Sequence, residues 1–242
     1  MERSTQRTVN GKPAPTRMSH REAIGRVVGA YRDPIVRSYS WGRFKIFRQR
    51  FLEEIGQYLP EHGRVLDIGC GFGLFALYYA QRCPGRHVVG FDLAERRIET
   101  ARQAAADLGL KNAEFHIGDA RGISALDPFD AIYLLDVLHH IPQDVVPSLL
   151  SSIHDALPVG GILVVKELDT SPTWQRLFAH ALDLMMSPDS PPHYWPQEKL
   201  ASTIEDAGFS VKRHQLIDYL PYPHVLYVAT KLGRTKPPAA SR

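Results

Sequence analysis

A glycine-rich loop is the part of the sequence whose residue types and spacing bear most directly on chemistry. Residues 65–73 read VLDIGCGFG, an apolar run that leads into Gly69, Gly71 and Gly73 before a helical pattern. Glycine tolerates positive φ and lets a ligand approach the backbone, and the amides that open a helix attract polar ligand groups. The loop therefore predicts a ligand-binding turn between a strand and a helix.

Two carboxylates flank this loop. Asp67 ends the first strand pattern, and Asp92 ends the second, VVGFD. Asp67 would repel a pyrophosphate but suits a cationic amine, whereas Asp92 can accept hydrogen bonds from both hydroxyls of a ribose. The spacing is GxGxG, and Leu74 stands where a dinucleotide fingerprint has its third glycine. These features favour a nucleoside with a cationic amine over NAD.

Two adjacent histidines, His139 and His140, follow the fourth strand pattern, FDAIYLLD. Ligands of open α/β sheets bind at the carboxyl ends of the strands, so an imidazole there is placed to act as a general base. The alternative is that both histidines only pack the loop.

A metal site is not expected. Acidic residues and histidines could cluster near these strand ends, but no HExxH or Cys/His ligand spacing occurs in the sequence. The candidates for such a cluster are Asp136, His139, His140, Glu167 and Asp169.

Alternating strand and helix patterns from Arg64 onward must position these residues. Apolar strands separated by helices predict a parallel sheet covered on both faces, and right-handed crossovers make it doubly wound. We expect five regions: a flexible basic tail at 1–20, a helical cap at 21–60, a catalytic domain at 61–233 with a lid insertion at 170–196, and a flexible tail at 234–242.

The helical cap carries an aromatic stripe at helical spacing, which predicts a face packed on the core. Its basic residues fall off the stripe, so we expect them in water; a face for a membrane surface or a nucleic acid is the alternative. The stripe is Phe44, Phe47, Phe51 and Ile55, and the residues off it include Arg43, Arg48 and Arg50.

Composition is that of one globular domain. The chain has 242 residues, 44% of them hydrophobic, a net charge of +3 and two cysteines. So few cysteines exclude a disulfide framework and indicate a reducing compartment, and no apolar run is long enough to span a membrane. We expect a cytoplasmic protein.

Several motifs in order resemble the class I S-adenosylmethionine (SAM) dependent methyltransferases. VLDIGCGFG and VVGFDLAERRIETAR are followed by GDA at 118–120, DAIYLLDVLHHI and LPVGGILVV, so that the resemblance spans about residues 63–168. It implies a seven-stranded, mostly parallel sheet in which a last strand, around 224–231, inserts antiparallel between the fifth and sixth.

The resemblance also implies roles for individual residues. The glycines would line the amino-acid part of SAM, Asp67 would organise its ammonium, and Asp92 would hold the ribose. The cofactor-binding residues implied are Asp67, Gly69, Cys70, Gly71, Gly73, Asp92, Leu93, Asp119, Ala120, Leu135 and Asp136. His140 is the first choice as catalytic base, because similar methyltransferases often carry a histidine there, and His139 is the second.

The acceptor is expected to be a small apolar or aromatic molecule, methylated most readily at oxygen. The insertion combines flat aromatic and adaptable methionine side chains, which suit such a ligand. Its candidate substrate contacts are Trp174, Phe178, Met185, His193, Tyr194 and Trp195.

Other functions stay open. An RNA or protein methyltransferase is one alternative, although the basic excess is small and no Asn-Pro-Pro-Tyr or Asp-Pro-Pro-Tyr motif follows the fourth strand. A non-catalytic SAM-binding partner protein is another, and the chain would be a monomer or a homodimer.

Overall fold

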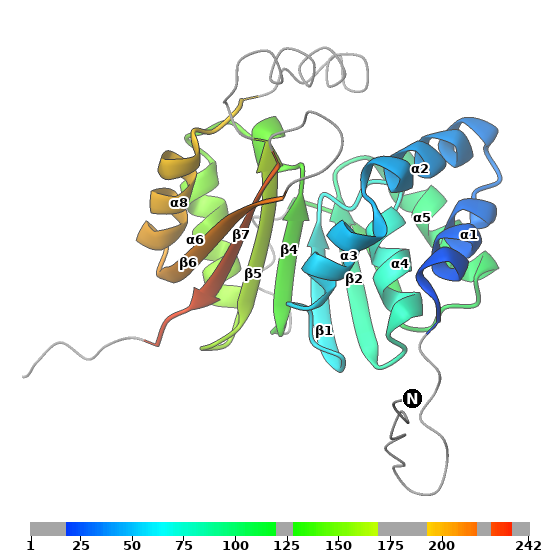
Figure 1. The fold of residues 1–242 in the computed structure, drawn as a ribbon, viewed down its shortest axis with the longest axis horizontal. Helices are drawn as coiled ribbons and strands as arrows, with labels where there is room; N and C mark the ends of the chain where they lie inside the picture. The colour runs from blue at the N-terminus through cyan, green and yellow to red at the C-terminus, as the bar shows by residue number, and fades with distance from the viewer. Residues whose placement is uncertain (1–17, 120–127, 169–192, 217–223, 234–242) are drawn as a thin grey trace, which may run out of the picture.

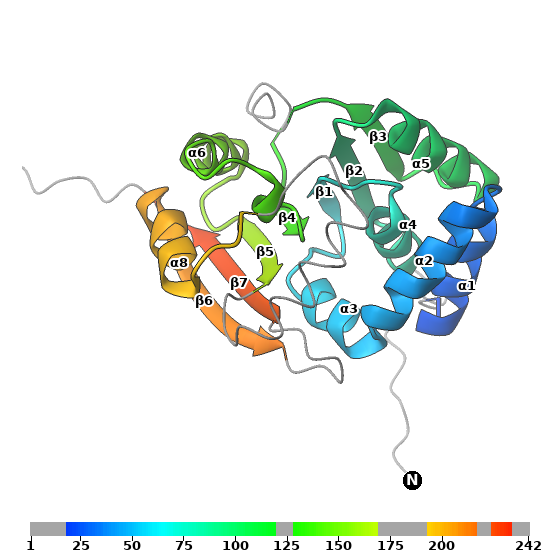
Figure 2. The same cartoon turned by 90° about the horizontal axis from the view of Figure 1, so that it is seen from above.

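The fold is a seven-stranded sheet with helices on both faces (Figures 1 and 2). The computed structural model describes residues 18–119, 128–168, 193–216 and 224–233. The strand order is β3-β2-β1-β4-β5-β7-β6. The strands are β1 (Gly63–Ile68), β2 (Arg86–Asp92), β3 (Ala113–Ile117), β4 (Ala131–Leu135), β5 (Ile162–Leu168), β6 (Phe209–Leu216) and β7 (His224–Lys231).

The sheet confirms the predicted topology. β1 to β5 pair in parallel, whereas β7 runs antiparallel to both β5 and β6 and lies between them. The strand order changes direction at β1, because β2 and β3 lie on one side of it, and β4 and β5 on the other. The carboxyl ends of β1, β2 and β4 therefore meet at the switch point where such sheets bind ligands.

The helices form two layers. Their bounds are α1 (His20–Ala30), α2 (Pro34–Ile46), α3 (Gln49–Gly56), α4 (Leu74–Arg82), α5 (Glu95–Asp107), α6 (Val146–Ala156) and α8 (Gln197–Asp206). One core cluster joins α1 to α5 with one face of the sheet, and a second joins α6 and α8 with the other face. In the part of the chain that is described, no helix has the length and apolarity needed to cross a membrane.

Three short helices make up the N-terminal cap, residues 20–56. Asp33 starts α2 by accepting hydrogen bonds from the amides of Ile35 and Val36, with Pro34 at the first helical position. The backbone leaves helical geometry at Phe47 and starts again at Gln49. The predicted aromatic stripe thus crosses two helices.

The stripe is buried as predicted: Phe44, Phe47, Phe51 and Ile55 all belong to the core. The expectation for Arg43 is wrong, because its side chain is only 24% exposed and pairs with Asp136. The side chain of Arg43 points inward because α2 lies over the ends of the strands, where Asp136 is its partner.

Candidate active site

The glycine loop joins β1 to α4 in the conformation that its sequence predicts. Gly69, Gly71 and Gly73 have φ of 72°, 55° and 78°. A Cβ on Gly69 would lie 2.6 Å from a methyl of Val137, whereas a Cβ on Gly71 would meet no atom within 4 Å. Gly69 is therefore required by packing, and Gly71 faces open space where a ligand can approach the backbone.

Asp92 ties the end of β2 to this loop. Its Oδ2 accepts a hydrogen bond of 2.9 Å from the Gly71 amide, and its Oδ1 accepts one of 2.8 Å from the Ala94 amide. The carboxylate is half-buried at the rim of the loop. This position is compatible with the predicted contact to a ribose.

Asp67 lies beneath the loop and is 2% exposed. Its Oδ2 accepts a hydrogen bond of 2.9 Å from the Tyr133 hydroxyl. Burial, with a smaller contribution from the negative charge of Asp92, raises the pKa of Asp67 well above its usual range although the hydroxyl opposes the shift. The carboxyl supports the loop from below, and its predicted role toward an ammonium stays a prediction.

Apolar side chains stand exposed beside Asp92, where an adenine is expected. Leu93 is 74% exposed and Ile117, at the end of β3, is 45% exposed. Asp119 is exposed two residues further on, and Ala120 lies outside the described residues. Exposed aliphatic groups at two adjacent strand ends offer a surface for a flat ring.

The other half of the site begins where β4 ends. Asp136 has φ of 60°, and it is the one non-glycine residue with positive φ among those described. This geometry ends the strand at Leu135 and turns His139 and His140 into a short 3-10 helix, Leu138–His140. Both histidines thus follow the fourth strand, as the sequence predicts, and the turn brings His139 against Glu167 of the neighbouring β5.

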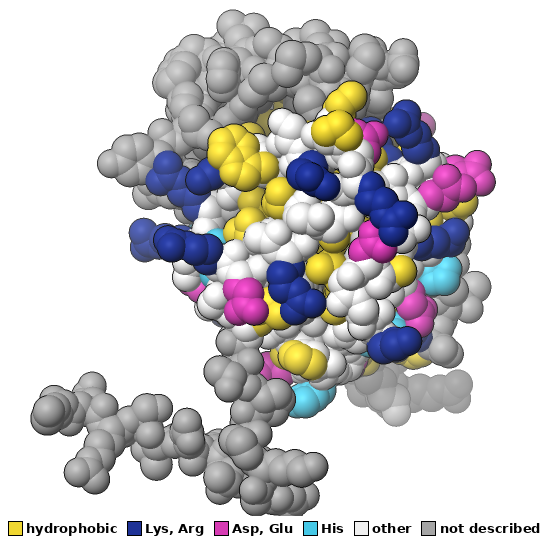
Figure 3. Space-filling model, turned by 90° about the vertical axis from the view of Figure 1, so that its right-hand side faces the viewer, with side chains coloured by type: hydrophobic (Ala, Val, Ile, Leu, Met, Phe, Trp, Pro, Cys, Tyr) yellow, Lys and Arg dark blue, Asp and Glu magenta, His cyan; other side chains and the backbone are white. Residues whose placement is uncertain are grey.

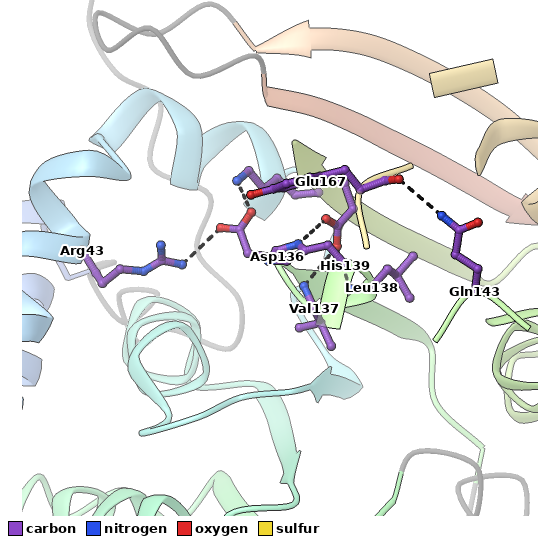
Figure 4. Close-up of polar contacts among 9 residues, drawn as sticks. Arg43, Asp136, Val137, Leu138, His139, Gln143 and Glu167 are labelled. Atoms are coloured by element: carbon purple, nitrogen blue, oxygen red, sulfur yellow. Dashed lines mark hydrogen bonds and ion pairs between the residues drawn. The ribbon is translucent and has the colours of Figure 1, made fainter. Parts of the chain in front are cut away.

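The Asp136 carboxylate is held between two cations. Lys166 of β5 donates to Oδ1, and Arg43 of α2 lies 3.2 Å from Oδ2 (Figure 4). Burial raises the pKa of Asp136, but Lys166 and Arg43 together outweigh it and hold the pKa well below its usual range. His224 is buried beside this group, and burial and Lys166 lower its pKa to about 2. Asp136 is thus ionised and His224 neutral at physiological pH.

Glu167 organises the turn from β5. Its Oε1 accepts hydrogen bonds from the amides of Val137 and Leu138, at 3.0 and 2.7 Å. Its Oε2 lies 2.6 Å from Nδ1 of His139 (Figure 4). Both side chains of this pair are almost fully buried. One carboxylate therefore fixes both the backbone of the turn and the imidazole that it carries.

Part of the predicted substrate segment lies against these histidines. The His193 amide donates to the His139 carbonyl at 2.6 Å, and the Tyr194 ring stacks on His139 with centroids 5.9 Å apart. His140 is half-buried, with its ring 4.1 Å from that of His139. His139 and His140 therefore lie in contact with the residues that precede α8.

Of the remaining predicted site residues, three are buried and three lie outside the described part of the chain. Trp195 is 3% exposed and packs in the core with Leu200 and Ile204, which favours a packing role. Cys70 and Leu135 are buried beneath the site, at 8% and 6% exposure. Trp174, Phe178 and Met185 lie outside the described residues.

Three potential metal-ligand atoms, from Asp136, His139 and Glu167, lie within 4.8 Å of one another. Both carboxylates already have strong partners in Lys166, Arg43 and the turn amides. A metal ion bound here would face an ammonium and a guanidinium at close range, so the donor set suits an internal ion-pair network better than a metal.

Sequence reasoning missed three members of this site: Arg43, Tyr133 and Lys166. For Lys166 a signal was present, because Lys166 and Glu167 are adjacent polar residues in the otherwise apolar run ILVVKEL. Charged side chains at the end of a buried strand need partners of opposite charge or hydrogen-bonding groups. Here Lys166 pairs with Asp136, and Glu167 contacts His139.

The comparisons with known proteins agree with this geometry. The family model described as "Methyltransferase domain" matches residues 42–214, which is most of the chain and includes the ends of strands β1 to β5 described above. The chain belongs to this methyltransferase family. This family is that of the class I SAM-dependent methyltransferases.

The names of relatives include both O-methyltransferases of ubiquinone biosynthesis and an N,N-dimethyltransferase. The 2-heptyl-1-hydroxyquinolin-4(1H)-one methyltransferase of Mycobacteroides abscessus is 34% identical over 48% of this chain and 55% of its own length. The N,N-dimethyltransferase OxyT of Streptomyces rimosus is 32% identical over 78% of this chain and 56% of its own. The chain spans about half the length of the curated relatives that it matches.

Solved structures show the same fold. A putative O-methyltransferase of Nostoc punctiforme has 26% identity and a TM-score of 0.63 over 79% of this chain and 60% of that one. The family implies SAM as methyl donor, and the open space over Gly71 with the exposed Leu93 and Ile117 beside Asp92 fits that cofactor.

Proposed function

We propose that this methyltransferase methylates an oxygen atom of a small apolar or aromatic molecule, with His139 as general base. The observation that carries the proposal is the buried pair of His139 and Glu167, whose Nδ1 and Oε2 are 2.6 Å apart. The sequence favoured His140, and the carboxylate partner changes that preference.

The pair has the geometry of an oriented base. In the proposed mechanism the Glu167 carboxylate accepts the hydrogen bond of the pair, so Nδ1 of His139 carries its proton. Nε2 is then the basic nitrogen of this imidazole. The same carboxylate stabilises the imidazolium that forms when Nε2 takes a proton, as a third group does in other nucleophile–base arrangements.

SAM supplies a methyl group on a sulfonium, which is reactive without further activation. Transfer of this methyl group to the acceptor oxygen would leave S-adenosylhomocysteine as the second product. The hydroxyl proton passes to Nε2 of His139. The chain must therefore orient the acceptor, remove one proton and exclude water.

The support for a small apolar acceptor comes from the surroundings of His139. Tyr194 stacks on its imidazole, and the His193 amide donates to its carbonyl, so the end of the predicted insertion contacts the base. The flat and adaptable side chains in the sequence of residues 170–196 suit an aromatic ligand. Names of relatives include both O- and N-methyltransferases, so the oxygen assignment depends on the base.

Turnover of phenols and amines by matched histidine variants tests the proposal. We expect His139→Ala to slow phenol methylation by about 10²–10⁴-fold. Its affinity for S-adenosylhomocysteine, measured by calorimetric titration, should not change. His87→Ala, a histidine on β2, is the control and should retain full activity.

Three outcomes would contradict parts of the proposal. A loss in His140→Ala without one in His139→Ala would return the base to His140. Amines that react faster than all phenols would contradict oxygen as the acceptor atom. Normal activity of both variants would leave the histidines with packing roles alone.

A further inference from the structure

We propose that the N-terminal cap docks on an anionic lipid surface through the outer face of α2. The proposal concerns a surface remote from the buried histidines, and it does not depend on which atom is methylated. It begins from the distribution of charge along the chain.

The chain is divided electrostatically. Residues 1–52 hold 12 of the 29 Lys and Arg residues but 3 of the 26 Asp and Glu residues, a net charge of +9. The remaining residues 53–242 therefore carry a net charge of −6. The overall value of +3 conceals this asymmetry, which is typical of proteins that bind a polyanion or a membrane through one end.

Within the cap the charge is concentrated on α2, the turn after it and the first turn of α3. From Pro34 to Leu52 the sequence has five basic residues and no acidic one. One of them, Arg43, points inward to Asp136. The other four, Arg37, Lys45, Arg48 and Arg50, are exposed.

The exposed face of α2 also carries large apolar groups. Pro34, Ser38, Trp41 and Lys45 recur at spacings of four, three and four residues and are all exposed, so they line one side of the helix. Trp41 is 57% exposed and Ile35, at the flank of this line, is 79% exposed. Lys45 lies over the Trp41 ring, 5.3 Å from its centroid.

Basic and apolar side chains on one exposed helical face are the composition of helices that lie in a membrane interface. Tryptophan prefers the headgroup level, and lysine and arginine reach the phosphates from long apolar stems. The view of this side in Figure 3 shows dark-blue Lys and Arg side chains with yellow hydrophobic ones among them, and magenta Asp and Glu side chains elsewhere on the same face.

A lipid surface explains the exposed apolar groups better than a nucleic acid does. Phosphate contacts to a polyanion need the arginines and lysine but leave the aliphatic Ile35 in water. A bilayer buries Ile35 and Trp41 and satisfies the cations with the same contact. Arg43 on the opposite side of α2 reaches the site, so the docked helix would lie between the bilayer and the catalytic residues.

Vesicle co-sedimentation with the full chain tests this inference. We expect binding to vesicles that contain phosphatidylglycerol and little binding to vesicles of phosphatidylcholine alone. Trp41→Ser, and separately Lys45→Glu with Arg50→Glu, should each weaken the binding by about tenfold or more. Lys111→Glu with Lys212→Glu changes net charge equally on exposed residues elsewhere and should bind as the parent does.

Titration with S-adenosylhomocysteine tests whether this surface is independent of the cofactor site. The Trp41 variant and the Lys45 and Arg50 double variant should both keep the parental affinity. Equal binding to neutral and anionic vesicles would overturn the inference. The inference would also be overturned if the Lys111 and Lys212 control pair weakened binding to anionic vesicles as much as the Trp41 variant or the Lys45 and Arg50 double variant does. Binding to polyuridylate that depends on Trp41 and Lys45, without vesicle binding, would assign the face to nucleic acid.

Discussion

Glu167 and His139, at the ends of β5 and of the turn after β4, are joined by a 2.6 Å contact between Oε2 and Nδ1. Glu167→Gln keeps the shape of the side chain but removes its charge. Since the imidazolium then loses its anionic partner, the acid limb of the pH–rate profile should move to lower pH. The maximum rate should fall about 10–100-fold, part of what a general base contributes. Glu114→Gln is a control at an exposed carboxylate, and an unshifted profile in Glu167→Gln would count against the oriented base.

Gly69 and Gly71 differ in a way that a pair of alanine variants can separate. Gly71→Ala should lower stability by only about 1–2 kcal/mol, because its methyl meets open space and the cost is that of positive φ. Its methyl occupies the ligand side of the loop, so affinity for S-adenosylhomocysteine should fall strongly.

Gly69→Ala should instead lower the melting temperature markedly, since its methyl would lie 2.6 Å from Val137. Adding Val137→Ala should recover part of the lost stability. Thermal unfolding and calorimetric titration of the three variants give both quantities. Equal affinity losses without a difference in stability would contradict this assignment of the two glycines.

Asp92→Ala should weaken binding of S-adenosylhomocysteine by about 1–3 kcal/mol, the range for charge-assisted hydrogen bonds. Two effects combine in this variant. The Gly71 and Ala94 amides lose their hydrogen-bond acceptor, and the ribose hydroxyls lose the carboxylate that is predicted to bind them. Asp92→Asn should lie between the parent and the alanine variant. An unchanged dissociation constant would remove Asp92 from the cofactor site.

Lys166→Met should reduce the free energy of unfolding by about 3–5 kcal/mol, the usual cost of breaking a buried ion pair. Asp136 then keeps Arg43 as a charged partner. The double variant Asp136→Asn with Lys166→Met should lose less than the sum of the single variants. Additive losses in denaturant titrations would show that the two groups are not coupled.

Asp67 should make stability depend on pH. Its pKa is raised by burial in the folded protein, so the folded state holds a proton that the unfolded chain releases near pH 4. Its stabilising contribution is complete below the unfolded pKa and is lost as pH rises through the folded one. The difference in melting temperature between Asp67→Asn and the parent should therefore grow more positive from about pH 4 upward. Asp144→Asn, at an exposed carboxylate, should show no such trend.

The sheet could be predicted from local patterns because apolar runs and glycine turns are properties of neighbouring residues. The site could be predicted only in part. The ion pairs that Asp136 forms with Lys166 and Arg43 join residues 30 and 93 positions apart in the sequence. Arg43 was expected in water because a helical pattern alone does not say that a carboxylate lies on the other side of the helix.

The inward reach of Arg43 has a consequence for engineering. One way to seek a new acceptor preference would be to replace the helices of residues 20–56 with those of a relative. Here such a graft would remove one of the two cations that hold Asp136, and the turn with both histidines starts at that residue. A chimera would keep its catalytic geometry only if the incoming helix brought an arginine to the same place, so the donor helix must be chosen by charge as well as by shape.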